Sequence, residues 1–336
     1  MSALIFIELL LLEGERKGMA RDGKDYHNKT PKVREMIERN SSSKTVSRFM
    51  EKMMPVLLFL IATISVLTTI GILYTLLSEA IEFFKRVPIW DFFTGTVLKP
   101  LSQNPEFGVL PLINGTIVST LIAMLVAGPI GLLSAIYLSE YASDKVRRVL
   151  KPLLEILAGI PTIVYGFFAF TFVTPLLRMI WPQVEATNII SPGLIMGVMI
   201  IPMIASLSED AMSSVPNAMR EGSLAMGATR LETTFKVVIP AAFSGIISSF
   251  VLGISRAIGE TMIVTIASGS SKNFTFDITQ SMQTMTAYIV EVSGGEAPAG
   301  STIYYSLYAV ALTLFVFTLI MNLLARYISR RFREEY

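Results

Sequence analysis

An arginine and a glutamate stand inside an otherwise apolar stretch of the chain. Arg256 and Glu260 are the only charged residues between positions 237 and 271, and they are one helical turn apart in sequence. A planar guanidinium can hold two oxygens of an anion at once, so Arg256 suits the binding of an oxyanion. Glu260 carries the charge to hold Arg256 in place until an anion competes for it. One interpretation of the pair is therefore an anion-binding site.

Other kinds of site lack the residues they need. The chain has no cysteine, and His27 is its only histidine, so neither a thiolate nor a histidine-based metal site has enough ligands. A phosphate-cradling loop ends in Gly-Lys-Ser or Gly-Lys-Thr, whereas Gly300-Ser301 has no lysine there. We therefore expect this chain to be no metalloenzyme and to contain no nucleotide site of this kind.

Long uncharged stretches predict helices that span a membrane. Charged residues make up 16% of the chain, against about 25% in soluble proteins. A helix needs about 20 residues to cross a bilayer. Six stretches of at least 19 residues contain no Asp, Glu, Lys, Arg or His: 53–78, 107–139, 156–177, 186–208, 237–255 and 297–325. The apolar character resumes after Glu260, so we expect the fifth helix to run over 241–268.

This placement puts Arg256 and Glu260 inside a span and leaves two interpretations open. An arginine at the bilayer centre costs about 2.5 to 3.5 kcal/mol, so the pair must face protein or water. Small residues recur every four positions on the same broad helix face: Gly245, Ser249, Gly253, Ala257 and Thr261. The pair is then either a structural salt bridge that neutralises itself or a charged element on a solute pathway.

The distribution of basic residues predicts the orientation of the spans. Segments that flank the spans on one side contain 22 Lys and Arg residues, and those on the other side contain 4. Lys and Arg near the ends of spans mark the cytoplasmic side. We therefore expect both termini in the cytoplasm, together with the segments 140–151 and 209–240.

A second span contains a helix-breaking sequence. Residues 159–166 read Gly-Ile-Pro-Thr-Ile-Val-Tyr-Gly, and Pro161 removes a helical hydrogen bond between two glycines. Irregular backbone at membrane depth is tolerated only against protein or a watery cavity. The segment is either an ordinary proline kink or a part of the pathway, with Thr162 and Tyr165 as candidates together with Thr261.

The cytoplasmic segment 209–240 predicts a compact helical knob. Pro216 is a good first residue for a helix, Gly227 supplies a sharp turn, and a second helix from about Thr229 leads to Pro240. The small residues Gly222 and Ser223 let another protein surface approach closely. We therefore expect this segment to bind a partner protein.

The knob resembles the EAA loop of ABC importer permeases. Glu221-Gly-Ser is followed by Gly227 and, after nine residues, by Val237-Val-Ile-Pro240. This matches the spacing of the family pattern Glu-Ala-Ala-x-x-x-Gly, nine residues, Ile-x-Leu-Pro, with Gly222 and Ser223 in place of the two alanines. The resemblance implies that Glu221, Gly222, Ser223, Gly227 and Pro240 couple the spans to an ATPase subunit.

Two further segments resemble the permeases of the Pst phosphate importer. These are Ser255-Arg-Ala-Ile-Gly-Glu-Thr-Met262 and Gly159-Ile-Pro-Thr-Ile-Val-Tyr-Gly-Phe-Phe168. The Met-Ile-Val after Thr261, the long basic N-terminal segment and Gln283-Thr-Met-Thr-Ala-Tyr-Ile289 are more similar to the C-type (PstC) subunit than to its A-type partner. The resemblance covers about residues 55–330, and residues 1–50 lie outside it.

This resemblance implies a fold and a set of partners. The fold is an all-α integral membrane protein with six transmembrane helices, as in type I ABC importer permeases (MetI-like). The implied partners are an A-type permease (PstA-like), an ATPase dimer (PstB-like) that binds ATP and magnesium, an extracytoplasmic phosphate-binding protein (PstS-like) and phosphate, and no nucleic acid. ATP hydrolysis is then expected on the separate ATPase subunit, and this chain is expected to be no enzyme by itself. The implied location is the cell (inner, cytoplasmic) membrane, with several passes.

The chain then divides into three parts. We expect a basic cytoplasmic tail over 1–52, a transmembrane permease domain over 53–325 with the coupling loop 209–240, and a basic tail over 326–336. The expected spans are about 55–77, 112–138, 153–180, 192–208, 241–268 and 303–325.

Three alternatives to a phosphate permease remain at this level. The coupling loop is shared among importers, so the substrate is phosphate or another oxyanion such as sulfate or molybdate. An ion-coupled secondary transporter would use Arg256 and Glu260 as a charge relay, but the arginine segment is not repeated in a second half of the chain, as such folds often require. A membrane sensor or scaffold would use the loop 209–240 only to bind a partner.

Overall fold

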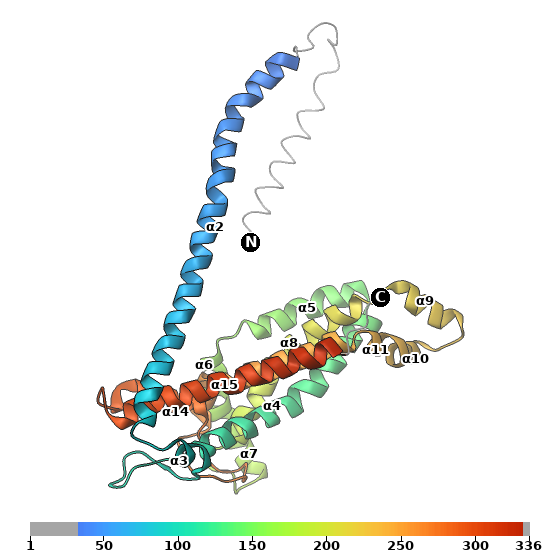
Figure 1. The fold of residues 1–336 in the computed structure, drawn as a ribbon. Helices are drawn as coiled ribbons and strands as arrows, with labels where there is room; N and C mark the ends of the chain where they lie inside the picture. Colours follow the sequence, from blue (N-terminus) through green and yellow to red (C-terminus); the bar gives the residue numbers. More distant parts are fainter. Residues whose placement is uncertain (1–32, 332–336) are drawn as a thin grey trace. The chain divides into compact units, whose positions relative to one another are not determined.

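The computed structural model describes residues 33–331, with side-chain surroundings from residue 53 onward, as a helical protein with one short two-stranded ribbon. Figure 1 shows the elements in chain order. They are α2 (Val33–Phe84), α3 (Ile89–Thr94), β1 (Leu98–Lys99), β2 (Glu106–Phe107), α4 (Leu110–Ile136), η1 (Tyr137–Tyr141), α5 (Asp144–Ala158), α6 (Thr162–Phe168), η2 (Ala169–Val173), α7 (Thr174–Ile180), α8 (Ile190–Ser213), α9 (Asn217–Ala225), α10 (Arg230–Thr233), η3 (Thr234–Val238), α11 (Ile239–Ala241), α12 (Phe243–Ile258), α13 (Met262–Ala267), α14 (Met285–Glu291), η4 (Val292–Glu296) and α15 (Thr302–Arg331), where η marks a π-helical turn.

The chain forms two compact units, and the boundary falls inside α2. The first unit ends at Ile70 and the second begins at Gly71. In the first unit, residues 53–70 form an apolar helix whose large side chains are exposed, among them Leu57, Phe59 and Leu67. Exposed apolar side chains all around a helix are typical of a span that faces lipid.

The segments expected as tails are partly helical. The tail expected over 1–52 is helical from Val33 on, and α15 continues through the expected tail over 326–336 as far as Arg331. Strong helix formers explain why the helices continue: Glu, Met and Arg in the first segment, and Arg326, Arg330 and Arg331 in the second. Residues 1–32 and 332–336 lie outside the described residues.

Five helical stretches among the described residues are long and apolar enough to cross a membrane. A sixth arises if the segments 230–241 and 243–258, which meet at an angle of 71°, count as one bent span. The five are Met53–Phe84, Leu110–Tyr141, Thr162–Ile180, Ile190–Ser213 and Thr302–Ile328. The protein is therefore a multi-pass membrane protein.

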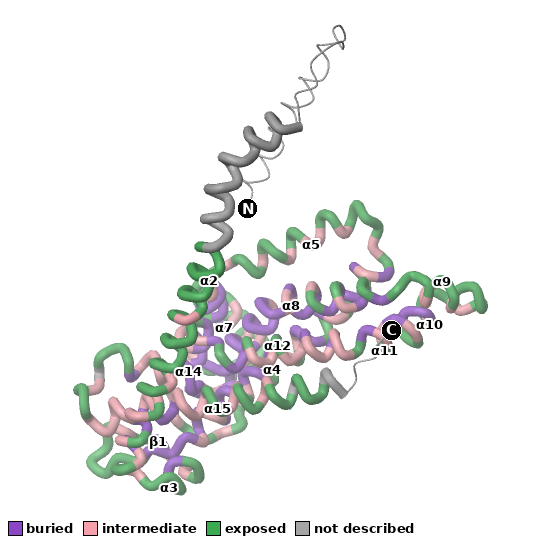
Figure 2. Tube along the Cα trace, turned by 45° about the horizontal axis from the view of Figure 1, so that its top comes forward, coloured by how far each residue is buried: buried purple, intermediate pink, exposed green. Residues whose placement is uncertain are grey.

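Helices α4 and α8 form the centre of the second unit, and small residues let them pack closely. Gly193 and Gly197 on α8 are four residues apart, the spacing that brings membrane helices together. An added Cβ at Gly193 would lie 2.8 Å from Ile122 Cβ, and one at Gly197 would lie 2.8 Å from the carbonyl oxygen of Ala123. Figure 2 shows α8 as a largely buried helix.

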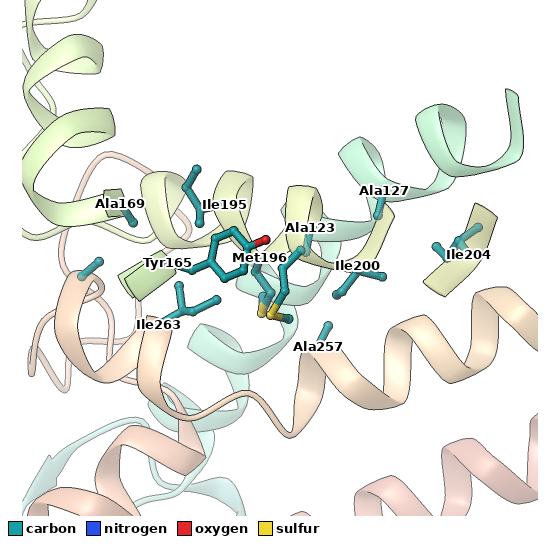
Figure 3. Close-up of a cluster of buried hydrophobic side chains, with 12 residues drawn as sticks. Ala123, Ala127, Tyr165, Ala169, Ile195, Met196, Ile200, Ile204, Ala257 and Ile263 are labelled. Atoms are coloured by element: carbon teal, nitrogen blue, oxygen red, sulfur yellow. The ribbon is translucent and has the colours of Figure 1, made fainter. Parts of the chain in front are cut away.

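The main apolar core surrounds α8 and joins five elements. Figure 3 shows Tyr165, Met196 and Ile263 pointing toward one another from α6, α8 and α13. Ala123 and Ala127 of α4 and Ala257 of α12 complete the cluster from the other side. These side chains hold the segments that carry the predicted site residues in one rigid body.

Two expected spans are interrupted in the structure. The span expected over 153–180 is not one helix, because α5 ends at Ala158 and α6 begins at Thr162. Pro161 is the N-cap residue of α6, so the break lies where a proline flanked by glycines predicts it. The span expected over 241–268 is also wrong as a single helix, since α12 ends at Ile258 and α13 begins at Met262.

A small substitution tests the close approach of α4 and α8. Gly197→Ala places a Cβ 2.8 Å from both the Ala123 carbonyl oxygen and Val126 Cβ, and overpacking of this kind costs about 1 to 3 kcal/mol. We expect a lower midpoint of thermal unfolding for the purified protein in detergent. Gly71→Ala is the matched control, because nothing lies within 4 Å of its added Cβ. Equal midpoints for the two variants would contradict the packing described here.

Candidate functional site

Arg256 faces a cavity between α5, α8 and α12. The cavity has a volume of about 300 Å³, and its wall includes Arg256, Met199, Ser206, Glu155 and Lys151. Arg256 lies in the last turn of α12, and its Nη2 atom is 3.8 Å from the Met199 sulfur. The sulfur is a weak acceptor, and Arg256 has no carboxylate partner among the described ion pairs. Its guanidinium therefore remains available to an anion.

Glu260 does not lie beside Arg256 as one continuous helix would place it. The helix ends at Ile258, and Gly259 and Thr261 lead into α13. The Glu260 carboxylate is buried and accepts a hydrogen bond from the backbone N–H of Ile263 at 3.5 Å, at the start of α13. The structural salt bridge between these two residues is thus absent from the described residues, and the helix break separates their side chains.

The other predicted pathway residues lie beside the two breaks but not in the wall of the cavity. The Tyr165 hydroxyl is buried in the core and donates a hydrogen bond to the Leu157 carbonyl at 2.7 Å. Thr162 begins α6, and Thr261 is the N-cap residue of α13. Tyr165 therefore links the two helices at the first break, whereas Arg256 alone of the five predicted pathway residues lines the cavity.

The helices that follow the two breaks pack against each other. An added Cβ at Gly166 of α6 would lie 3.2 Å from the Met262 carbonyl oxygen and 2.9 Å from Ile266 Cδ1 of α13. The side chains of Tyr165 and Ile263 meet in the same core (Figure 3). The predicted break at Pro161 and the unpredicted break after Ile258 therefore lead into helices that are neighbours in the fold.

A second group of charges lines the cavity away from Arg256. Glu209 on α8 is fully buried, and its carboxylate accepts hydrogen bonds from Lys151 Nζ at 2.8 Å, from Ser213 Oγ at 3.1 Å and from Arg147. Lys151 also contacts Asp210 Oδ1 at 3.0 Å. The hydrogen bond to Glu209 raises the pKa of Lys151 above its ordinary value, so Lys151 stays charged.

Sequence reasoning did not select Lys151, Glu155 or Glu209 for the pathway. Glu155 and Glu209 lie at the edges of uncharged stretches, and Lys151 lies four residues before Glu155, where charges ordinarily mark the end of a span. Only the fold of α5 back along α8 places them in the cavity wall. Among the described residues, no group of three histidine or acidic side chains is positioned to hold a metal ion.

The expected knob forms at the end of the second unit where α8 ends and α12 begins (Figure 1). Glu221 and Gly222 are exposed on α9, and no atom lies within 4 Å of a Cβ added at Gly222. Gly227 has a φ of 90°, which strains any residue with a side chain. Ser223 pairs with Thr233 Oγ1 at 2.9 Å, and Pro240 is exposed in α11. The structure thus offers an open surface of small residues.

A buried ion pair, which sequence reasoning missed, anchors the knob to the membrane helices. Arg220 of α9 donates to the Glu140 carboxylate of η1, with Nη2 and Oε1 3.0 Å apart. The same guanidinium donates to the carbonyls of Met212 at 2.7 Å and Val215 at 2.6 Å. One side chain therefore ties α9 to the ends of both α4 and α8.

Comparison with solved structures identifies the fold. This chain resembles a chain in the structure of a bacterial ABC transporter involved in the import of the acidic polysaccharide alginate, with a TM-score of 0.58 and 18% identity over 86% of this chain and 100% of that one. The inward-facing MetNI methionine ABC transporter gives a TM-score of 0.50 and 19% identity over 68% of this chain and 95% of that one. The fold is that of an ABC importer permease.

The family follows from the sequence comparisons. The model of the binding-protein-dependent transport system inner membrane component matches residues 127–334, and the chain belongs to this family. Its members are permeases and are not themselves catalytic.

Curated relatives cover most of the chain. The probable ABC transporter permease protein YqgH of Bacillus subtilis is 36% identical over 72% of this chain and 78% of its own length. The probable phosphate transport system permease protein PstC of Methanocaldococcus jannaschii is 30% identical over 82% of this chain and 94% of its own length. The phosphate transport system permease protein PstC of Mesorhizobium japonicum is 32% identical over 72% of this chain and 79% of its own length.

Removing the anchor of α9 tests how the knob is held. Arg220→Gln leaves the buried Glu140 without its partner, and breaking a buried pair in this way costs about 3 to 5 kcal/mol. We expect the backbone amides of residues 217–225 to exchange with solvent at least about tenfold faster, because local opening becomes easier. Arg148→Gln is the control, since Arg148 is exposed and donates only to the Asp144 carbonyl. Unchanged exchange in Arg220→Gln would rule out the anchor.

Proposed function

We propose that this chain is a PstC-type permease subunit that forms the pathway for inorganic phosphate together with a second, related permease. The observation that carries the proposal is the unpaired guanidinium of Arg256 in the wall of a cavity between membrane helices. The names of the relatives from Methanocaldococcus and Mesorhizobium, which are phosphate transport system permeases, support the choice of anion.

A carboxylate in the cavity wall favours phosphate over a fully ionised oxyanion. Glu155 lines the cavity together with Arg256 and forms no ion pair among the described residues, whereas Glu209 is already paired with Lys151. Hydrogen phosphate carries a hydroxyl that donates a hydrogen bond to a carboxylate, whereas sulfate and molybdate at neutral pH carry none. A wall with both cations and carboxylates therefore accepts hydrogen phosphate and repels the other two anions.

The family and the distribution of basic residues support the proposed partners and orientation. The chain pairs with an A-type permease in the cell membrane, with both termini on the cytoplasmic side. A cytoplasmic ATPase dimer binds ATP and magnesium and docks on the knob through Glu221, Gly222, Ser223 and Gly227, with Pro240 at its base. An extracytoplasmic binding protein delivers phosphate to the opposite side.

Uptake of labelled phosphate tests the proposed function. The chain is reconstituted into vesicles with its permease partner, ATPase and binding protein, and accumulation of labelled phosphate is followed with and without ATP. We expect uptake that requires ATP and is unaffected by excess sulfate, because sulfate cannot donate to the cavity carboxylates. Competition by sulfate or molybdate at equal strength would instead show a general oxyanion permease, and uptake driven by an ion gradient would show a secondary transporter.

Substitution of Arg256 tests its place in the pathway. Arg256→Ala removes the unpaired guanidinium, and a charge-assisted, two-point contact of this kind is worth about 1.5 to 3 kcal/mol. We expect uptake to fall at least about tenfold while the complex assembles normally, because the side chain makes no ion pair that supports the fold. Arg178→Ala is the matched control: Arg178 is an exposed arginine at the end of a span and lies outside the cavity wall. Normal uptake by Arg256→Ala would refute the assignment.

A further inference from the structure

The cavity has cationic groups at both of its ends. Met199, which contacts Arg256, and Glu209, which holds Lys151, lie ten residues apart on α8. At 1.5 Å per residue they are separated by about 15 Å along the helix. Pro202, Met203 and Ser206 of α8 line the cavity between them. An anion that leaves Arg256 along this wall therefore next meets Lys151.

Lys151 is held by acidic side chains rather than by packing. Helix α5, which carries Lys151, contains no buried residue (Figure 2). Its contacts with the end of α8 include the bonds from Lys151 to Glu209 at 2.8 Å and to Asp210 at 3.0 Å. The Lys151 side chain is 32% exposed, whereas that of Glu209 is 1% exposed. The lysine is thus accessible from the cavity, and the buried carboxylate is its resident counter-anion.

The knob connects to the same end of α8. Arg220 donates to the Met212 carbonyl, one turn beyond Glu209, and Ser213 donates to the Glu209 carboxylate. A displacement of the knob therefore moves the backbone next to the pair formed by Lys151 and Glu209. By the predicted orientation of the spans, this end of the cavity faces the cytoplasm.

We propose that Lys151 forms a second oxyanion subsite at the inner end of the pathway, and that Glu209 occupies it until the anion displaces the carboxylate. The proposal rests on the proposed function and names a further residue of the same pathway. Arg256 receives the anion, Lys151 takes it over in competition with Glu209, and the return of Glu209 to Lys151 releases it. Asp210, the exposed second partner of Lys151, competes in the same way but less strongly.

Competition makes a prediction that a merely structural ion pair does not make. Removing Lys151 weakens anion binding, whereas removing its competitor Glu209 strengthens it. A structural pair gives the same direction of change for both substitutions, since either one breaks the same contact. The signs of the two shifts in affinity therefore separate the two roles.

The experiment measures equilibrium binding of ³²P-labelled inorganic phosphate to the assembled transporter in lipid nanodiscs, without the binding protein. Binding to the isolated ATPase subunits is subtracted. We expect Lys151→Gln to weaken phosphate binding about tenfold, because one charge-assisted hydrogen bond to the anion is lost. We expect Glu209→Gln to tighten phosphate binding by up to about tenfold, because the anion no longer has to displace a carboxylate from Lys151. Lys151→Arg keeps the charge and the native affinity. Lys145→Gln, an exposed lysine of α5 outside the cavity, is the matched control.

Two further points make the test decisive. Glu209 is buried, so Asp210→Asn serves as the second competitor variant, because that side chain is 57% exposed and its loss does not threaten the fold; we expect a smaller tightening. If Lys151→Gln and both acidic variants shift the affinity in the same direction, or none shifts it, the subsite is wrong and the proposed function stands. A different outcome is that sulfate or molybdate binds in place of phosphate, with affinity lowered by Lys151→Gln and raised by the two acidic variants. In that case the proposed substrate is wrong and the subsite stands.

Discussion

The cost of placing a guanidinium between membrane helices is the constraint on which this structure depends. An arginine at membrane depth must meet protein or water, and in a continuous helix Glu260 would meet it one turn away. The structure instead ends α12 two residues after Arg256 and buries Glu260 at the start of α13. The break removes the neutralising partner and leaves the cation in a cavity. It thereby turns a residue that is expensive to accommodate into one that can bind an anion.

Helix α8 joins this site to the surface that meets other proteins. Its Met199 contacts Arg256, its Glu209 holds Lys151, and its Met212 carbonyl accepts a hydrogen bond from Arg220 of the knob. Helix α8 is packed closely against α4 through Gly193 and Gly197. Because such close packing leaves little room for local rearrangement, a displacement at one end of α8 is transmitted along the helix. The same rigid element therefore carries both the anion pathway and its link to the knob.

The sequence predicted the parts of this arrangement that depend on local physics. Uncharged stretches predicted six spans, of which two are interrupted in the structure. The sequence around Pro161 predicted the first break, and Gly227 and Pro216 predicted the turn and the helix of the knob. Its family resemblance led to the same fold that the comparisons show. The second break was missed, because Gly259 alone is a weak signal inside an apolar run and the burial of Glu260 depends on contacts with distant segments such as Thr286. For the same reason Lys151, Glu209 and the pair of Arg220 with Glu140 are visible only once α5, α8 and α9 are folded together.

The central claim is that the helix break presents Arg256 to an anion in the cavity. It is tested most directly by anomalous diffraction from crystals of the assembled transporter grown with arsenate, a tetrahedral analogue of phosphate. The account predicts an arsenic peak inside the cavity, within hydrogen-bonding distance of the Arg256 guanidinium. An Arg256 side chain paired with Glu260, together with an arsenic peak outside the cavity, would contradict it.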